Sequence, residues 1–134
     1  MIMKRIILDT NFLMIPFQFN LDIFSEIDRV CDFNYELCVF EKTIEELKHI
    51  AENQRGKDKK SAKFALDILK MKKINAIKSE NKDVDELILE NALGNTIIAT
   101  QDIALRRKLK EKGASMIVLR QKKYLQLVET AQVS

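Results

Sequence analysis

The chain has 134 residues, of which 46% are hydrophobic and 32% are charged, and its formal net charge is +3. This composition is that of an ordinary globular domain, and it excludes a collagen-like chain, a disordered chain and a disulfide scaffold. Cys31 and Cys38 lack the spacing of zinc ligands, so we expect two buried, reduced thiols within a single domain spanning 1–134.

The first half of the chain alternates between strand and helix patterns. Residues 4–9 form an apolar run that predicts a buried strand, and 21–32 carries apolar residues at helical spacing. A short strand is expected at 36–40, followed by a helix from 43 to about 54. A basic turn at 55–60 is then expected to end this helix and separate it from the next one.

The second half continues the alternation. We expect a helix over 61–74 capped by Ser61, a strand at 75–78 and a helix over 84–93 capped by Asp83. A strand at 95–99 and a helix over 102–112 that stops at Gly113 should follow. The chain is then expected to form a strand at 115–119 and a basic C-terminal tail over 120–134. Strands that alternate with helices predict an α/β fold with a mostly parallel sheet covered on both faces.

Acidic residues follow the points where apolar strands end. Asp9 comes directly after the first strand, and Asp102 follows the strand at 95–99. Glu46 and Asp85 lie in the first turns of predicted helices. Because the carboxyl ends of parallel strands meet at one edge of a sheet, and the following helices start there, we expect these four carboxylates along that edge.

Gathering carboxylates is unfavourable because each negative charge raises the pKa of its neighbours. A divalent cation removes that cost, and Mg²⁺ and Mn²⁺ prefer carboxylate oxygens and water as ligands. Such a metal activates water and neutralises the charge that builds on a phosphate. The acids, together with several basic clusters, therefore fit metal-dependent hydrolysis of phosphodiester bonds.

Each acid also has a purely structural explanation. Asp9 can accept backbone hydrogen bonds at a turn, and Asp102 can cap the following helix. Thr43 and Glu46 have the spacing of a capping box, and Asp85 would favour the amino end of its helix electrostatically. These alternatives stay open for single residues, but they do not explain why the fold would bring all four to one edge.

Five segments carry a family resemblance that covers essentially the whole chain. They are Leu8-Asp9-Thr10-Asn11, Thr43-Ile44-Glu45-Glu46-Leu47, Val84-Asp85-Glu86-Leu87-Ile88 with Ala92, Ile98-Ala99-Thr100-Gln101-Asp102 with Leu105, and Val118-Leu119-Arg120. In order and spacing these segments resemble the PIN-domain nucleases. The chain is most similar to the archaeal branch, which is like the nuclease of eukaryotic small-subunit ribosomal RNA processing, and VapC toxins share the domain.

The resemblance implies an α/β/α sandwich and a Mg²⁺- or Mn²⁺-dependent endoribonuclease, acting in ribosomal RNA processing or as a VapC-type toxin. It implies that Asp9, Asp85 and Asp102 hold the metal. Glu46 completes the acidic quartet, either as a general base or as a supporting residue. The resemblance further implies that three polar residues orient the carboxylates or a metal-bound water and take part in substrate binding: Thr10, Asn11 and Thr100.

Two positions depart from the family pattern. The family often has Thr-Asn-Asp where this chain has Gln101 before the acid, and it often has two Asp residues where this chain has Asp85 and Glu86. Which of Asp85 and Glu86 faces the metal is therefore open. Glu45 and Glu46 also compete, because neighbouring residues point about 100° apart on a helix.

RNA is the expected partner. Basic residues from the 55–60 turn, Arg55 and Lys57, together with Arg106 and Arg107, would hold RNA phosphates, although such clusters also occur as solvated helix faces. The apolar segment after the first strand is expected in the core, with contact to a second copy as the alternative. An antitoxin or a ribosome-assembly protein is a further partner. No leader or membrane segment is apparent, which favours a cytoplasmic protein.

Two rival functions belong to other classes. A non-catalytic RNA-binding module of a ribosome-assembly complex would keep the basic clusters and bind metal weakly. A phosphotransfer domain would also place acids at strand ends, but a phosphatase expects a second Asp where this chain has Asn11, and a receiver domain expects a Lys at a late strand end that the sequence does not show.

Overall fold

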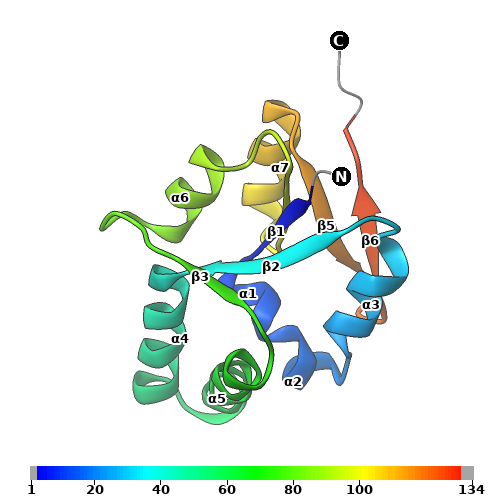
Figure 1. Ribbon diagram of the computed structural model, residues 1–134. Helices are drawn as coiled ribbons and strands as arrows, with labels where there is room; N and C mark the ends of the chain where they lie inside the picture. The colour runs from blue at the N-terminus through cyan, green and yellow to red at the C-terminus, as the bar shows by residue number, and fades with distance from the viewer. Residues whose placement is uncertain (1–2, 131–134) are drawn as a thin grey trace.

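A six-stranded sheet in the order β3-β2-β1-β4-β5-β6 runs through the computed structural model, which describes residues 3–130 (Figure 1). Its strands are β1 (Lys4–Leu8), β2 (Tyr35–Phe40), β3 (Asn75–Ile77), β4 (Thr96–Ala99), β5 (Ser115–Arg120) and β6 (Tyr124–Val128). The helices are α1 (Thr10–Leu13), α2 (Ile15–Phe19), α3 (Ile23–Val30), α4 (Glu41–Asn53), α5 (Gly56–Met71), α6 (Val84–Glu90) and α7 (Ile103–Lys112). Strands β1 to β5 pair in parallel and β6 is antiparallel to β5, which confirms the predicted fold class.

Helices cover both faces of the sheet because successive strand residues point to opposite sides. Ile6 and Leu8 of β1 are buried against the side that carries α1 to α5, whereas Ile7 is buried against α6 and α7. The two apolar clusters lie on either side of the central strands, with α6 and α7 on one side of the sheet and α1, α2, α4 and α5 on the other (Figure 1). The result is the expected three-layer α/β/α sandwich.

The strand order reverses at β1. From β1 the chain builds outward through β2 and β3, then returns to β4 on the other side of β1 and continues to β5 and β6. In open α/β sheets, ligands bind outside the carboxyl ends of the strands at such a reversal. Leu8 and Ala99 are register partners there, so Asp9 and Thr100 leave adjacent strands side by side.

The connection between α4 and α5 is tighter than the sequence predicts. Gly56 has a φ of 65°, a left-handed conformation that glycine adopts without steric cost, and α5 starts at this residue. The basic residues 57–60 therefore lie in the first turns of α5 and form no separate turn. Ser61 is buried inside the helix, where its hydroxyl donates to the Lys57 carbonyl at 2.7 Å, so the prediction that it caps the helix is wrong.

Helix α6 is shorter than predicted. It ends at Glu90, where the side-chain amide of Asn91 donates to the Leu87 carbonyl at 2.7 Å. Asp83 lies at the predicted N-cap position, but its side chain makes no capping hydrogen bond. Helix α7 stops at Gly113 as predicted, and the φ angle of Gly113 is 80°.

The segment after β1 forms the short helices α1 and α2, which are too short to show a helical period. Phe12, Met14 and Ile15 are buried in the core, as expected, whereas Phe17 is 39% exposed and contacts Phe64 of α5. Contact with a second copy stays a prediction. None of the helices within 3–130 is long and apolar enough to span a bilayer.

The predicted basic tail contains a strand. Residues 124–128 form β6 because Leu125 and Leu127 alternate with polar residues and pack on the core, a strand that the sequence analysis did not predict. The last part of the predicted tail, 131–134, lies outside the described residues.

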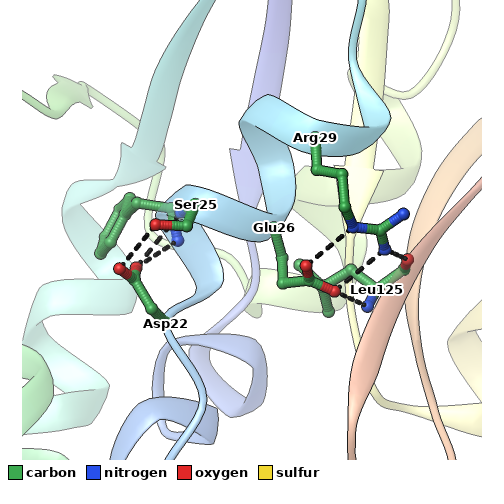
Figure 2. A network of polar contacts seen from close by, with 6 residues as sticks. Asp22, Ser25, Glu26, Arg29 and Leu125 are labelled. Atoms are coloured by element: carbon green, nitrogen blue, oxygen red, sulfur yellow. Dashed lines mark hydrogen bonds and ion pairs between the residues drawn. The ribbon is translucent and has the colours of Figure 1, made fainter.

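Helix α3 holds β6 through a pair of charged residues. The Leu125 amide donates to Glu26 Oε1 at 2.9 Å, and Arg29 Nη2 donates to the Leu125 carbonyl at 2.9 Å (Figure 2). Arg29 and Glu26 also form an ion pair at 2.8 Å. Asp22 caps the same helix by accepting from the Phe24 and Ser25 amides (Figure 2). These contacts satisfy backbone groups at the open edge of the sheet, which would otherwise pair with another chain.

We expect Glu26→Ala to lower the free energy of unfolding by about 1–2 kcal/mol at pH 7, because it removes a charge-assisted backbone hydrogen bond and an ion pair. The hydrogen bond from Arg29 lowers the pKa of Glu26 below its ordinary value of 4.5, so this stabilisation is present above that pH and is lost as the pH falls. Thermal unfolding at pH 7 and pH 3, with Glu52→Ala as an exposed control, measures it. An equal loss at both pH values would contradict the proposed clamp.

Candidate active site

Asp9 is the centre of the candidate site. It leaves β1 at the strand-order reversal and is only 4% exposed. Its Oδ1 accepts from the Thr10 amide at 2.8 Å and its Oδ2 accepts from the Thr100 hydroxyl at 2.7 Å. The carboxylate is therefore fixed by one bond from its own turn and one from the adjacent strand end.

Burial raises the pKa of Asp9 from 3.8 to about 6. The hydrogen bonds from Thr100 and Thr10 act in the opposite direction, and the nearby charges of Asp85 and Glu46 raise the pKa further. A buried carboxylate beside two others is costly as an anion without a cation. This is the electrostatic environment that a divalent metal would stabilise.

Glu46 reaches the site from α4. Its Oε2 accepts from the Thr10 hydroxyl at 2.8 Å, so Thr10 links it to the turn that holds Asp9. Glu45 is turned away, is exposed and forms an ion pair with Lys42 at 3.7 Å. Of the two neighbouring acids, the structure therefore brings Glu46 to the site.

The capping-box explanation of Glu46 is wrong. Helix α4 begins at Glu41, two residues before Thr43, so Thr43 is inside the helix and cannot be its N-cap. The Thr43 hydroxyl is fully buried and has no hydrogen-bond partner within the described part of the chain. Glu46 is therefore held by Thr10 and serves no cap.

Asp102 joins the site through Thr100. The Thr100 hydroxyl donates to Asp9 and accepts from the Asp102 amide at 3.1 Å. Asp102 Oδ1 accepts from the Leu105 amide at 3.1 Å, which confirms that it caps α7. The capping and site positions are compatible, because a cap at this helix lies at the carboxyl edge of the sheet.

Asp85 lies in the first turn of α6 on the other side of the sheet. Its pKa is raised, first by burial and next by the charge of Asp102. Because its own charge raises the pKa of Asp9, Asp85 stands near both strand-end acids. Asp85 and Glu86 are both exposed. We call Asp9, Glu46, Asp85 and Asp102 the acidic rim.

The acidic rim fits a divalent cation in its chemistry. Within residues 3–130 no three Asp, Glu, His or Cys side chains converge closely enough to enclose an ion by themselves. Mg²⁺ does not require such a cage, since it keeps several waters and is usually bound by one or two carboxylates. The donor set is all carboxylate, and burial raises the pKa of Asp9 at its centre.

The basic residues divide into two groups. The first group lines a groove of about 730 Å³ between α7 and the β5–β6 hairpin, and it consists of Arg106, Arg107, Lys110 and Arg120. Burial and the nearby charge of Arg120 lower the pKa of Arg106, and no ion pair engages either guanidinium within residues 3–130. Ile103, the residue after Asp102, also lines this groove, so one part of it lies close to the acidic rim.

Arg55 and Lys57 lie elsewhere. They follow the end of α4, and the seven helical steps from Glu46 to Asn53 span about 10 Å along the helix. The Lys57 ammonium stands 6.0 Å from the centre of the Phe19 ring. These two predicted phosphate-binding residues therefore do not touch the acids, although they lie on the same side of the sheet as α1 and α2.

Sequence reasoning missed Arg120 as a site residue, although its place at the end of β5 was a usable signal. It named Asn11 but missed Gln101 as a site residue beside the rim. Asn11 is exposed, and its carbonyl accepts from the Gln101 side-chain amide at 2.7 Å. This bond ties the β4–α7 loop to α1, which no sequence pattern indicates.

We expect Thr100→Val to move the acid limb of the pH–rate profile to higher pH. The substitution keeps the shape of a fully buried side chain but removes the hydroxyl that lowers the pKa of Asp9, so that pKa rises further above 6. Thr100→Ser, which keeps the hydroxyl, should retain the wild-type profile. An unchanged acid limb in Thr100→Val would show that Asp9 does not control the reaction.

Comparisons with known proteins agree with this geometry. Residues 6–122 match a family described as a PIN-like domain. The chain is 32% identical over 127 residues to Ribonuclease VapC4 of Methanocaldococcus jannaschii, covering 93% of this chain and 97% of that protein.

Two solved structures share the fold. The PIN domain endonuclease Utp24 superposes with a TM-score of 0.76 at 17% identity, covering 96% of each chain. A domain of a functionally unknown protein from Methanocaldococcus jannaschii superposes with a TM-score of 0.56 at 16% identity, covering 98% of this chain and 96% of that one. The family match and the VapC4 relative together show that this chain belongs to the PIN-like domain family and is a homologue of PIN-domain nucleases.

Proposed function

We propose that the protein is a Mg²⁺- or Mn²⁺-dependent endoribonuclease that hydrolyses RNA phosphodiester bonds. The observation that carries this proposal is the acidic rim at the strand-order reversal, where a buried carboxylate has its pKa raised to about 6 among other acids. The similarity to Ribonuclease VapC4 supports RNA as the substrate. A cytoplasmic location is part of this proposal.

Asp9 and Asp102, with Asp85, would hold the metal, which when bound would activate water and neutralise charge on the phosphate. Thr100 orients Asp9 and Asp102 together, since its hydroxyl bonds to both. The hydrogen bond from Thr10 engages Oε2 of Glu46 and leaves Oε1 to accept a proton from the attacking water. Thr10 thus fixes the general base relative to Asp9.

The groove beside α7 would hold the RNA backbone. The charge of Arg120 lowers the pKa of Arg106, and neither side chain forms an ion pair in the described part of the chain, so a phosphate would pair with both. Arg107 and Lys110 extend the positive surface away from the rim. Arg55 and Lys57 would contact the strand at a greater distance.

Incubation of purified protein with a mixed-sequence single-stranded RNA tests the proposal. We expect cleavage with Mn²⁺ or Mg²⁺ and none with EDTA. Cleavage that continues in EDTA would refute metal dependence. RNA binding without cleavage under any metal would favour the non-catalytic RNA-binding module.

We expect the double variant Arg106→Ala/Arg120→Ala to weaken RNA binding about tenfold or more at low salt and to reduce the salt dependence of binding, because fewer counterions are released. Fluorescence anisotropy of a labelled RNA at several salt concentrations measures both effects. Lys73→Ala removes an exposed charge before β3, at the opposite edge of the sheet, and should change neither. Equal losses in both proteins would show that the groove has no special role.

The cellular role is proposed to be that of a toxin or of a ribosomal RNA processing factor, with an antitoxin or an assembly protein as partner. The two roles differ in their effect on a host cell. Growth arrest by the wild type but not by an Asp9→Asn protein would support the toxin. Normal growth with both proteins would favour RNA processing.

A further inference from the structure

We propose that a pocket beside the acidic rim binds one RNA base next to the bond that is cut, and that amide side chains in it select that base. This inference rests on the proposed nuclease function. The pocket encloses about 380 Å³, which lies within the range of about 300–1,000 Å³ typical of small-molecule sites. It lies between α1, α2, α4, α5 and the β4–α7 loop.

Its position follows from two shared residues. Asp102 belongs to the acidic rim and also lines the pocket. Asn11 lines the pocket two residues after Asp9, at the start of α1. A phosphate held at the rim would therefore carry its neighbouring base to the mouth of this pocket.

The lining is rich in amides. Asn11, Gln18, Gln54 and Gln101 come from four separate elements or loops and all face the pocket. Each amide can donate and accept hydrogen bonds, which is how Asn and Gln read the edges of bases. Within residues 3–130, no hydrogen bond engages the side-chain amides of Asn11, Gln18 or Gln54, so these groups are available to a ligand.

A hydrogen bond to the backbone fixes the side chain of Gln101 at the pocket. Its Nε2 donates to the Asn11 carbonyl at 2.7 Å, which leaves its Oε1 as a fixed acceptor at the pocket. The bond further joins the loop that carries Asp102 to the helix that follows Asp9.

Apolar and acidic residues complete the pocket. Met14, which is 5% exposed, and the half-buried Ile50 offer an apolar surface for the face of a base. Asp58 lines the pocket as an acceptor, which suits the exocyclic amino group of adenine, cytosine or guanine. Uracil has no such group, so we expect the pocket to disfavour it.

Sequencing the products of a randomised single-stranded RNA pool tests this proposal. The wild type should show a preference at one position near the cut, with uracil disfavoured about tenfold. Gln54→Ala and Gln18→Ala should flatten the preference at that position only. Asn53→Ala is the matched control, since it removes an exposed amide from the same helix that bonds to His49 and does not line the pocket, and it should keep the preference.

The experiments distinguish failure of the proposed base pocket from failure of the proposed nuclease function. Cleavage by Gln54→Ala and Gln18→Ala with the wild-type base preference would overturn the pocket and leave the nuclease standing. If the wild type cuts no RNA, the proposed function fails, and nuclear magnetic resonance decides the pocket. Shifts of the Gln18 and Gln54 side-chain amide signals on addition of adenosine monophosphate, larger than with uridine monophosphate, would support it, and unmoved signals would refute it.

Discussion

Replacement of Asp9 by asparagine should abolish metal-dependent RNA cleavage, lowering the rate by about three orders of magnitude or more, because it removes the carboxylate at the centre of the acidic rim. Asparagine has nearly the same shape and can still accept from the Thr10 amide or the Thr100 hydroxyl. The loss should therefore be chemical, with the fold retained.

Three observations make this test specific. Circular dichroism should show the same secondary structure for wild type and Asp9→Asn. Asp67→Asn, which changes an exposed acid on α5, should cut RNA at the wild-type rate. An Asp9→Asn protein that cuts as fast as wild type would exclude Asp9 from the reaction.

The same substitution should make the metal-free protein more stable at neutral pH. The pKa of Asp9 is raised in the folded state from 3.8 to about 6, so folding favours the protonated carboxyl. That contribution is fully present below about pH 4 and is lost as the pH rises through 6. Ionised Asp9 costs about 3 kcal/mol, and because asparagine replaces its two hydrogen bonds only in part, we expect a gain of about 1–3 kcal/mol.

Denaturant unfolding in EDTA measures this gain. The difference in unfolding free energy between Asp9→Asn and wild type should be largest near pH 7.5 and should vanish near pH 4. Added Mn²⁺ should stabilise wild type and not the variant, because only the folded wild type would bind it. A difference that does not change between pH 4 and pH 7.5 would contradict the raised pKa.

Loss of cleavage and a gain in the free energy of unfolding, found together in Asp9→Asn, would show that the ionised carboxylate serves the reaction and lowers the stability of the fold. A buried anion without a cation is unfavourable to the fold, and the rim keeps it in place through Thr10 and Thr100. Comparable trade-offs arise where an active site must hold charges that a stable core would exclude.

The fold class and the principal acids could be predicted because strong local patterns fix them. The apolar strands at β1 and β4 end directly before Asp9 and Thr100, and parallel strands place their carboxyl ends at one edge. The sheet order that makes β1 and β4 neighbours depends on long-range packing, which the sequence alone does not show. The sequence therefore predicted which edge would carry the acids, and the structure added how they are connected.

Other features could not be predicted because they depend on contacts between distant segments. Only the tertiary structure shows that Glu46 faces the Thr10 hydroxyl, 36 positions away, while Glu45 faces solvent. Helix α5 begins earlier in the sequence than predicted, because Gly56 adopts a left-handed conformation that reverses the chain without a loop. The amide pocket combines Gln18 and Gln54, which no motif connects.

Manganese binding tests the acidic rim most directly. Electron paramagnetic resonance of free Mn²⁺ should show a decrease on adding wild-type protein at pH 7.5, little decrease with Asp9→Asn, and a wild-type decrease with Asp67→Asn. That result would establish Asp9 as part of a divalent metal site, as proposed. Equal binding by wild type and Asp9→Asn, or no binding by wild type at concentrations that support cleavage, would contradict it.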